Sequence, residues 1–358
     1  MKFGLFIIGD YHDESVSTSK RFAQCMSQVE MAERLGFHSV WFAEHHANRY
    51  GLIGNTLTMA AAAAVRTERV RLGTGIVILP FAHPLRVAEE AAMVDNLSNG
   101  RLDLGVGRGY QPREFALFRE PMEESRDRFD EALTIIEKAL TGEPFSHHGR
   151  RWDFDDVMVR PAPVQRPVPI WVAAASMSTF THMGLQGYRI ISSPNFTSVD
   201  KIREFDQMYK DGLRRGGFDP SEYSITLQRQ TYVGEDEVEA REGPREASVR
   251  YHQMLGTLIA DKDEVRPGYE MYSKSRSRLE RVTYEDILEE AVNYGTVDQV
   301  AERLKFQRDE LGVDYYLAWF DFGGLPFDLV QASIERFGKE VIPRLAEPPD
   351  GEGEATAV

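Results

Sequence analysis

Two adjacent histidines follow an acidic residue in the segment EHHANRYGLIGN, which begins at Glu44. His45 and His46 could be metal ligands, a general base with its neighbour, or polar residues where a strand ends. Adjacent residues of an extended strand point to opposite faces, so both side chains cannot reach one metal ion. The sequence contains no H-x-H motif or suitable carboxylate cluster, and we expect no metal site. The other two interpretations stay open at this point.

A glycine-rich segment, GVGRGYQPREF, follows another apolar run and contains Arg108. It does not match a dinucleotide-binding fingerprint. The third glycine would fall at Tyr110, Pro112 interrupts, and the following helix is expected only from about residue 124. Glycines on both sides of Arg108 let a planar or phosphorylated ligand approach the backbone while the guanidinium binds it. An ion pair between Arg108 and an acid at a neighbouring strand end is the alternative.

The segment AAASMSTF supplies hydroxyl groups where a helix is expected to begin. A helix N-terminus binds anions through its free N–H groups and its dipole, and Ser176 and Thr179 add side-chain donors. Ordinary helix capping by Ser176 or Ser178 explains the same residues. The phosphate interpretation gains support from Arg108, which is expected on an adjacent strand.

The elements that must position these residues alternate along the chain. Apolar β-rich runs and helical patterns alternate eight times, which is the count of a parallel barrel closed on itself. We therefore predict a fold of the α/β class, a (β/α)8 TIM barrel, in which functional residues lie at the carboxyl ends of the strands. The eight predicted strands cover residues 2–9, 39–46, 69–80, 101–107, 169–174, 188–193, 223–233 and 314–320.

Two insertions interrupt the pattern. After the fourth strand, residues 144–156 are expected to form a small hairpin with its turn at Gly149. Between strands seven and eight, a long helix is predicted over 236–260, followed by the polar segment 261–286. A polar segment of this length beside the carboxyl ends of the strands is a candidate mobile lid, and a solvated surface excursion is the alternative.

Composition excludes several classes of protein. The 358 residues carry a formal net charge of −15, which argues against a nucleic-acid partner. Cys25 is the single cysteine and cannot form an internal disulfide, which suits a reducing compartment. No apolar stretch approaches the roughly 18 residues of a membrane helix, and the apolar start is predicted to be a strand and not an export signal. We expect a cytoplasmic protein without a membrane partner.

At the level of motifs, the chain resembles the bacterial luciferase-like flavin-dependent monooxygenases, and is most similar to the catalytic α subunit of luciferase. The resemblance covers most of the chain. It rests on EHHANRYGLIGN, LGTGIVILPFAHPLR, LSNGRLDLGVGRGYQPREF and VAAASMST, which fall in family order and at family spacing.

The resemblance implies a barrel that binds reduced FMN at the carboxyl ends of its strands. It implies that His45 is catalytic and that Glu44 and His46 support it. Three groups are implied to bind FMN. Gly75 and Ile76 would form a non-prolyl cis peptide under the ring. Arg108, Ser176 and Thr179 would bind the phosphate, helped by backbone amides near Tyr110 and Ala175.

The chain departs from the family pattern at four positions. The family's reactive cysteine beside the flavin is Gly107 here, and its strand-four aspartate is Glu114. Ala175 replaces an acidic residue of the phosphate loop, and Gln111 matches the luciferase tyrosine after the glycine-rich turn. A pocket altered in this way need not accept a long-chain aldehyde, so light emission is not predicted.

The predicted function is that of an oxygenase in a two-component system. Reduced FMN, delivered by a separate flavin reductase, would react with O2 to give a flavin peroxide or hydroperoxide. That species would oxygenate an organic substrate by hydroxylation, Baeyer–Villiger insertion or aldehyde oxidation. The alternatives are a deazaflavin-dependent dehydrogenase on the same barrel and a non-catalytic flavin-binding subunit, which the presence of His45 and Arg108 disfavours.

The domain organisation is expected to be simple. Residues 1–345 are predicted to form one domain, and residues 346–358, poor in large apolar side chains, are predicted to form a disordered tail. The family resemblance implies pairing through helices near the first units of the barrel, and we expect a homodimer.

Overall fold

The structure, a computed structural model, describes residues 1–193, 199–259, 269, 279 and 281–346. The candidate lid therefore lies mostly outside the described residues, and so does nearly all of the predicted tail. Within the described part of the chain, no helix is long and apolar enough to cross a membrane.

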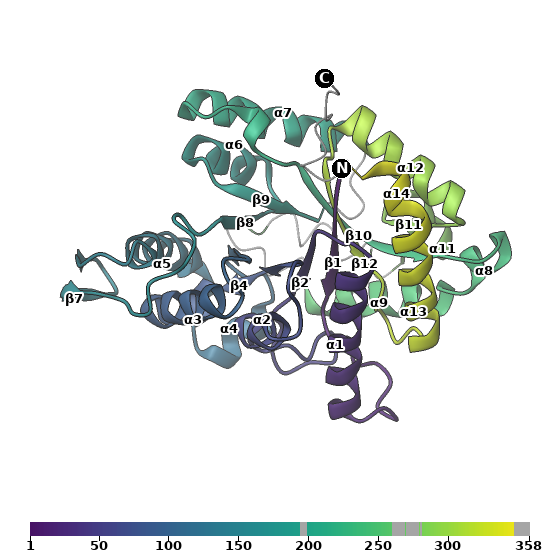
Figure 1. The fold of residues 1–358 in the computed structure, drawn as a ribbon, viewed down its shortest axis with the longest axis horizontal. Helices are drawn as coiled ribbons and strands as arrows, with labels where there is room; N and C mark the ends of the chain where they lie inside the picture. Colours follow the sequence, from purple (N-terminus) through teal and green to yellow (C-terminus); the bar gives the residue numbers. More distant parts are fainter. Residues whose placement is uncertain (194–198, 260–268, 270–278, 280, 347–358) are drawn as a thin grey trace, which may run out of the picture.

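A curled parallel sheet forms the centre of the molecule, and helices cover its outside (Figure 1). Its strand order is β11-β10-β12-β1-β2-β3-β5-β8-β9, and β4 pairs with β5. Helices on the outside of a parallel sheet leave both faces of its strands buried, which explains the long apolar runs in the sequence. The strands are β1 (Lys2–Ile7), β2 (Ser39–Phe42), β3 (Arg71–Thr74), β4 (Val77–Ile78), β5 (Leu102–Gly107), β8 (Ile170–Ala174), β9 (Arg189–Ser192), β10 (Thr226–Val233), β11 (Val292–Gly295) and β12 (Tyr315–Trp319).

The covering helices turn apolar faces toward the sheet. In α1 (Thr18–Arg34), Cys25, Val29 and Ala32 are fully buried, at the three- and four-residue spacing of one helix face. Ser17 caps this helix by accepting the backbone N–H of Lys20. The other covering helices are α2 (Thr56–Ala64), α3 (Pro84–Leu97), α5 (Ser125–Leu140), α6 (Met177–Gln186), α7 (Val199–Gly216), α12 (Val297–Leu311), α13 (Phe327–Arg336) and α14 (Ile342–Leu345).

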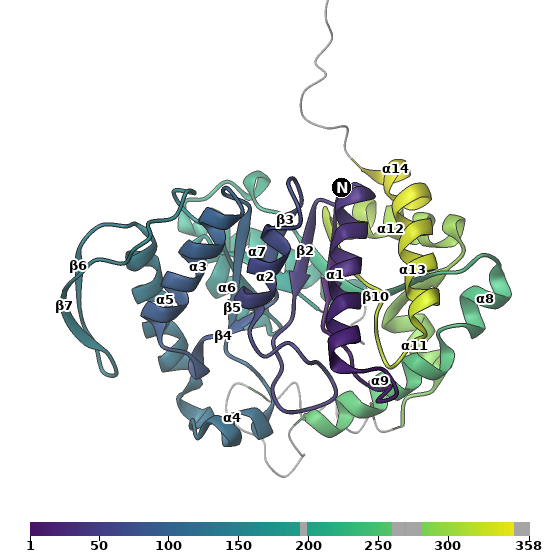
Figure 2. The ribbon, with the colours of Figure 1, turned by 60° about the horizontal axis from the view of Figure 1, so that its bottom comes forward.

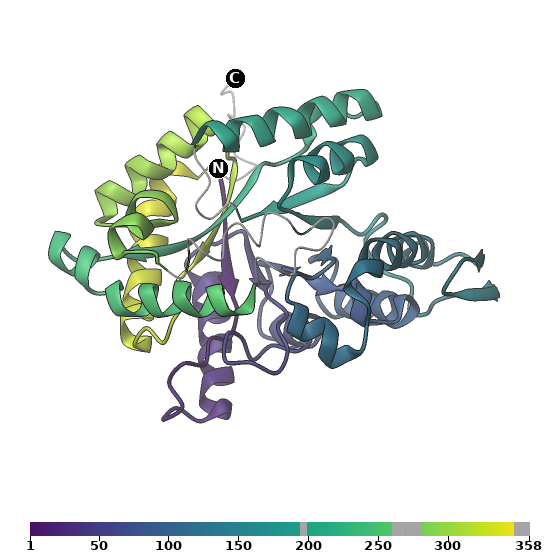
Figure 3. The same ribbon diagram turned by 180° about the vertical axis from the view of Figure 1, so that it is seen from behind.

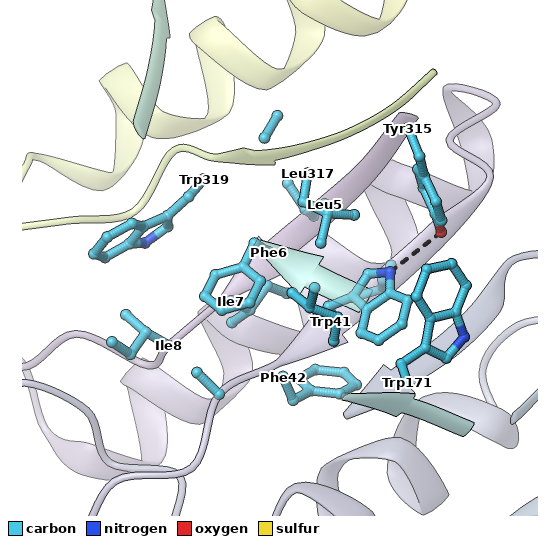
Figure 4. Close-up of a cluster of buried hydrophobic side chains, with 14 of the residues drawn as sticks. Leu5, Phe6, Ile7, Ile8, Trp41, Phe42, Trp171, Tyr315, Leu317 and Trp319 are labelled. Carbon is cyan, nitrogen blue, oxygen red and sulfur yellow. Dashed lines mark hydrogen bonds between the residues drawn. The ribbon is translucent and has the colours of Figure 1, made fainter. Parts of the chain in front are cut away.

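Aromatic side chains fill the interior of the curled sheet (Figure 4). Trp41, Trp171 and Tyr315 pack edge to face, with ring centroids 5.4 to 6.4 Å apart. The indole N–H of Trp41 donates to the Ser39 hydroxyl at 2.7 Å and to the Tyr315 hydroxyl at 3.3 Å. Gly73 makes room for Trp41, because a Cβ at this glycine would lie 2.1 Å from Cδ2 of the indole. This part of the interior is therefore solid.

A side chain joins the sheet where β9 lies beside β10. The hydroxyl of Thr226 donates to the carbonyl of Ile190 at 2.7 Å and accepts the backbone N–H of Ser192 at 3.1 Å. The strand pairings of β10 run instead to β12 and β11. The sheet thus curls back on itself, with the Thr226 hydroxyl bridging the junction.

Between β10 and β12, one sequence prediction is wrong and one strand was not predicted. The helix predicted over 236–260 is divided into α8 (Glu237–Glu242) and α9 (Arg245–Leu258), with Pro244 between them. Proline has no backbone N–H for the helical hydrogen bond, so a continuous helix does not form. After α11 (Tyr284–Glu290), β11 adds a further parallel strand to β10, which the sequence pattern does not predict. Its sequence, VNYG, contains Asn293 and Gly295, two residue types that are depleted in strands.

The two ends of the molecule differ in their coverings. The strands β6 (Phe145–His148) and β7 (Asp153–Val157) pair antiparallel and project beyond α5 (Figures 1 and 2). The helices α4 (Pro112–Phe118) and α9 lie at the end opposite the N-terminus (Figures 2 and 3). Because β1 starts at the N-terminus and the sheet is parallel, this is the end where the strands finish.

Candidate active site

Small residues form an open floor inside the carboxyl end of the sheet. Ala173 lies on β8 yet is exposed, and Gly107 on the neighbouring strand β5 has no side chain. Gly75 and Ile76, between β3 and β4, are half-buried, and the peptide bond that joins them is cis, as the family resemblance implies. We call these four residues the floor. Three of the four floor residues are glycine or alanine, which lets a flat ligand lie close to the backbone beside the Ile76 side chain.

The two histidines after β2 have different surroundings. The His45 residue is 8% exposed, and its Nδ1 atom lies 3.0 Å from Nε2 of Gln111 and 3.4 Å from Oε1 of Glu114. The His46 ring instead packs edge to face against Phe118, with centroids 4.6 Å apart. The two side chains have different partners, as predicted, although β2 ends at Phe42 and the pair follows the strand instead of lying in it. Among the described residues, no group of three or more His, Cys, Asp or Glu side chains could hold a metal ion.

The short helix α4 brings Gln111 and Glu114 to His45. It begins directly after Gln111, which corrects the expectation of no helix before about residue 124. Pro112 starts the helix instead of interrupting it, because the first helical position needs no N–H donor and suits the fixed φ of proline. Both Gln111 and Glu114 are buried, at 0% and 1% exposure. They therefore act inside the protein and not as surface polar groups.

Glu44 and His46 form an ion pair in which Oε1 and Nε2 are 2.9 Å apart. Burial by itself would lower the pKa of His46, but the hydrogen bond and charge of Glu44, with the charge of Glu114, raise it above the ordinary value. Burial also raises the pKa of Glu44, against the opposing effect of His46. Both pKa values rise, so the pair retains a proton to higher pH than two separate groups would.

Arg108 follows β5 and lies close to an aromatic ring. Its guanidinium carbon is 4.9 Å from the ring centroid of Tyr269, and the Tyr269 hydroxyl is 2.8 Å from the hydroxyl of Ser125. Burial raises the pKa of Asp130 on α5, and the charge of Arg108 is among those that oppose this rise. The positive charge at this strand end therefore reaches an acid on a helix.

Hydroxyl groups gather where α6 begins. Ser176 precedes the helix, but its side chain makes no capping hydrogen bond. Its hydroxyl instead contacts the hydroxyls of Thr179 at 2.8 Å and Ser178 at 3.1 Å. Because β5 and β8 are paired, Arg108 and these hydroxyls follow adjacent strand ends. A guanidinium, hydroxyl donors and a helix N-terminus in this order can bind a phosphate.

A comparison with protein-family models shows which family the chain belongs to. The model described as luciferase-like monooxygenase matches residues 1–315. The chain belongs to the luciferase-like monooxygenase family. The resemblance inferred from the motifs around His45 and Arg108 is thereby confirmed.

Two relatives in the luciferase-like family match nearly the whole chain. The oxygenase component of the flavin-dependent trigonelline monooxygenase of Acinetobacter baylyi is 29% identical, over 97% of this chain and 96% of the relative. The alkanal monooxygenase alpha chain of the Kryptophanaron alfredi symbiont is 26% identical, over 97% of this chain and 99% of the relative.

Solved structures share the fold. The monooxygenase RslO1 of Streptomyces bottropensis superposes with a TM-score of 0.84 at 31% identity, over 97% of this chain and 100% of that protein. The oxygenating constituent of 3,6-diketocamphane monooxygenase from Pseudomonas putida, solved with FMN, superposes with a TM-score of 0.79 at 20% identity, over 97% of this chain and 99% of that protein. An F420-dependent secondary alcohol dehydrogenase superposes with a TM-score of 0.76 at 19% identity, over 97% of this chain and 99% of that protein. The last two show the fold alone.

Three residues close to the histidine pair were not among the site residues predicted from the sequence. The Tyr50 ring packs edge to face against His45 at 4.5 Å, and its hydroxyl is 2.8 Å from that of Tyr251 on α9. The amide of Asn48 donates to the carbonyl of His46 at 3.1 Å. Asn48 and Tyr50 lie within the motif EHHANRYGLIGN, which was the available signal. Tyr251 has no local signal, because only the tertiary fold brings α9 to this site.

Proposed function

We propose that the chain is the oxygenase component of a two-component monooxygenase that uses reduced FMN and O2 to oxygenate an organic substrate. A separate flavin reductase supplies the reduced cofactor. One observation carries this proposal: Gly107 and Ala173 of the floor lie on the paired strands β5 and β8, whose ends bear Arg108 and the Ser176 and Thr179 hydroxyls, and buried His45 follows β2 at the same end of the sheet. Flavin-dependent relatives support it.

The described residues fit FMN in shape and charge. The exposed Ala173 and the half-buried Gly75 and Ile76 offer a flat, apolar surface for the ring system. Arg108 offers a cation for the phosphate, and the first turn of α6 offers hydroxyls and N–H groups, with Tyr110 and Ala175 flanking them in the chain. When bound there, reduced FMN would supply the two electrons needed to activate O2.

The protein's own side chains would position the substrate and exclude water. His45 would contact the reacting group as a base or hydrogen-bond partner, while Gln111 and Glu114 hold its ring. The ion pair of Glu44 and His46 would support this segment from the other side. Aromatic rings, including Tyr50 and Tyr251, line the neighbourhood of His45 and would limit the entry of water.

The finer features of the fold belong to the same proposal. The curled sheet would be the family's (β/α)8 barrel, closed at the junction that Thr226 bridges, and residues 1–345 would form one domain that pairs as a homodimer. Light scattering on the purified chain tests the pairing. A mass equal to twice 40.7 kDa is expected, and a mass of 40.7 kDa would contradict it.

Oxygen-isotope labelling tests the reaction. The purified chain, mixed with photoreduced FMN and 18O2, should insert one labelled oxygen atom into a member of a panel of ketones, aldehydes and aromatic compounds. An N-methylpyridinium carboxylate belongs in the panel because of the trigonelline relative. A product without 18O would contradict oxygenation. The absence of any FMN-dependent product from all compounds of the panel would contradict it as well.

Replacement of His45 tests its role. His45→Ala should bind FMN like the wild-type protein but release hydrogen peroxide in place of product, with product formation lower by about 10²–10⁴-fold. His83→Ala, at an exposed histidine, is the matched control and should keep full coupling. Undiminished product formation by His45→Ala would remove His45 from the mechanism.

A deazaflavin-dependent dehydrogenase is the second candidate, because the fold is shared with an F420-dependent alcohol dehydrogenase. Anaerobic titration distinguishes the two. A dehydrogenase should bind the deazaflavin more tightly than FMN and should reduce it with an alcohol in the absence of O2. The proposed oxygenase should bind reduced FMN and form no product until O2 is added.

A further inference from the structure

A chain of hydrogen bonds leading to His45 begins at a backbone N–H. The N–H of Tyr50 donates to Oδ1 of Asn48 at 2.9 Å. A backbone N–H can only donate, so the oxygen of the Asn48 amide must face Tyr50 and its nitrogen must face away. That nitrogen donates to the carbonyl of His46 at 3.1 Å, and a carbonyl can only accept. Two independent contacts therefore fix the orientation of the Asn48 amide.

The Asn48 amide in turn orients the amide of Gln111. Nδ2 of Asn48 donates to Oε1 of Gln111 at 3.5 Å, the longest bond of the chain. With its oxygen turned to Asn48, Gln111 directs Nε2 toward Nδ1 of His45 at 3.0 Å. The same nitrogen lies 3.4 Å from the hydroxyl of Tyr110. An amide nitrogen can only donate, so Nδ1 of His45 must accept and carries no proton.

We propose that Asn48 and Gln111 are positioning residues that hold neutral His45 in the tautomer with its proton on Nε2. The Nε2 atom of His45 has no hydrogen-bond partner in the described part of the chain. His45 thus presents an N–H donor to a ligand, and not a lone pair. A donor selects an acceptor, so the group bound beside His45 carries a carbonyl or anionic oxygen. This last step rests on the proposed function, whereas the tautomer does not.

Glu114 has a different role at the same ring nitrogen. Its Oε1 atom lies 3.4 Å from Nδ1 of His45 and is firmly held by the backbone N–H of His46 at 2.9 Å. A neutral ring accepts at Nδ1 from Gln111, whereas a ring protonated on both nitrogens can donate from Nδ1 to the Glu114 carboxylate. Gln111 therefore selects the tautomer, and Glu114 provides a partner for the charged ring.

Nitrogen-15 NMR of the full chain, with labelled histidine and without cofactor, measures the tautomer directly. A neutral imidazole gives a pyrrole-type shift for its N–H nitrogen and a pyridine-type shift for the other. His45→Phe assigns the signals by removing them. The expected result is a pyrrole-type Nε2 and a pyridine-type Nδ1 for His45. The reverse pattern would overturn the proposal.

Asn48→Asp tests the chain of bonds without touching the ring. Aspartate keeps the acceptor for Tyr50 but has no donor for Gln111, whose amide should rotate and offer its oxygen to His45. The two nitrogen shifts of His45 should then exchange types. Gln111→Glu presents an acceptor directly and should give the same exchange, which keeps the test decisive if Asn48→Asp does not fold. Asn55→Asp, at the exposed cap of α2, should leave the wild-type pattern.

Oxygenation assays separate this inference from the proposed function. Gln111→Glu should lower product formation per FMN oxidised by about tenfold or more, while the Kd for FMN stays within about twofold of the wild type. Exchanged NMR shifts with unchanged coupling would overturn the donor role of His45. Wild-type NMR shifts in both Asn48→Asp and Gln111→Glu would overturn the orienting role. The NMR result does not depend on whether the wild-type chain is an oxygenase, whereas the coupling result does.

Discussion

Oε1 of Glu114 accepts the backbone N–H of His46 at 2.9 Å, although the two residues are 68 positions apart in the sequence. The carboxylate comes from α4 and the N–H from the segment after β2. One buried side chain therefore fixes the backbone of the histidine pair, and the same oxygen lies 3.4 Å from Nδ1 of His45.

Removal of the Glu114 carboxylate should destabilise the protein. In Glu114→Ala, the N–H of His46 loses its acceptor, and a buried donor without a partner costs about 1–3 kcal/mol of unfolding free energy. Glu114→Gln keeps an acceptor oxygen and should lose less. Urea unfolding measures the difference, with Glu89→Ala on the exposed face of α3 as the control. Equal stability of Glu114→Ala and the wild type would contradict this role.

The ion pair of Glu44 and His46 should make stability depend on pH. Burial acts to lower the pKa of His46, but Glu44 outweighs burial and raises it. A raised folded-state pKa contributes stability that is fully present below the unfolded value of about 6.5 and is lost as the pH rises through the folded value. Unfolding free energies measured from about pH 6 upward should therefore decrease.

A variant without the titrating ring isolates this effect. His46→Gln should flatten the decrease, because glutamine does not titrate in this range. His148→Gln, on the exposed hairpin, should keep the wild-type slope. An identical slope in His46→Gln and the wild type would show that the pair does not cause the dependence.

A side chain at Gly107 should displace the end of Ile76. A Cβ there would lie 2.2 Å from Cδ1 of this half-buried side chain, so Gly107→Ala should push Ile76 off its rotamer at a cost of about 0.5–1.5 kcal/mol. Ile76→Val removes that Cδ1 atom. The double variant should therefore be more stable than the sum of the two single changes predicts, by about 0.5–1.5 kcal/mol. Thermal unfolding of all four proteins measures this coupling, and strict additivity would contradict the contact.

Arg108 should contribute to FMN affinity. Removal of a charge-assisted phosphate contact costs about 1.5–3 kcal/mol, so Arg108→Ala should weaken FMN binding by about 10- to 150-fold. Fluorescence titration with FMN measures this, and titration with riboflavin, which lacks the phosphate, should show little difference between the two proteins. Arg113→Ala, at an exposed arginine of α4, is the control. Equal FMN affinity in Arg108→Ala would place the phosphate elsewhere.

Local patterns in the sequence determined much of the fold. Apolar runs and helical stripes predicted the parallel strands and their covering helices, because burial on both faces of a strand and on one face of a helix leaves a periodic record. Elements with unfavourable residue types escaped prediction. The strand β11 contains Asn and Gly, which are depleted in strands, and α4 begins at Pro112, which predicts an interruption although proline suits the first helical position.

The sequence by itself also determined which residues could do chemistry: His45 within its motif, Arg108 between glycines, and the hydroxyls of Ser176 and Thr179. Only the tertiary structure decided how they are held. Gln111 and Glu114 reach His45 across 66 and 69 positions of the chain. Such contacts depend on how successive β/α units pack, and no local periodicity encodes them. The tautomer of His45 is therefore a property of the folded site.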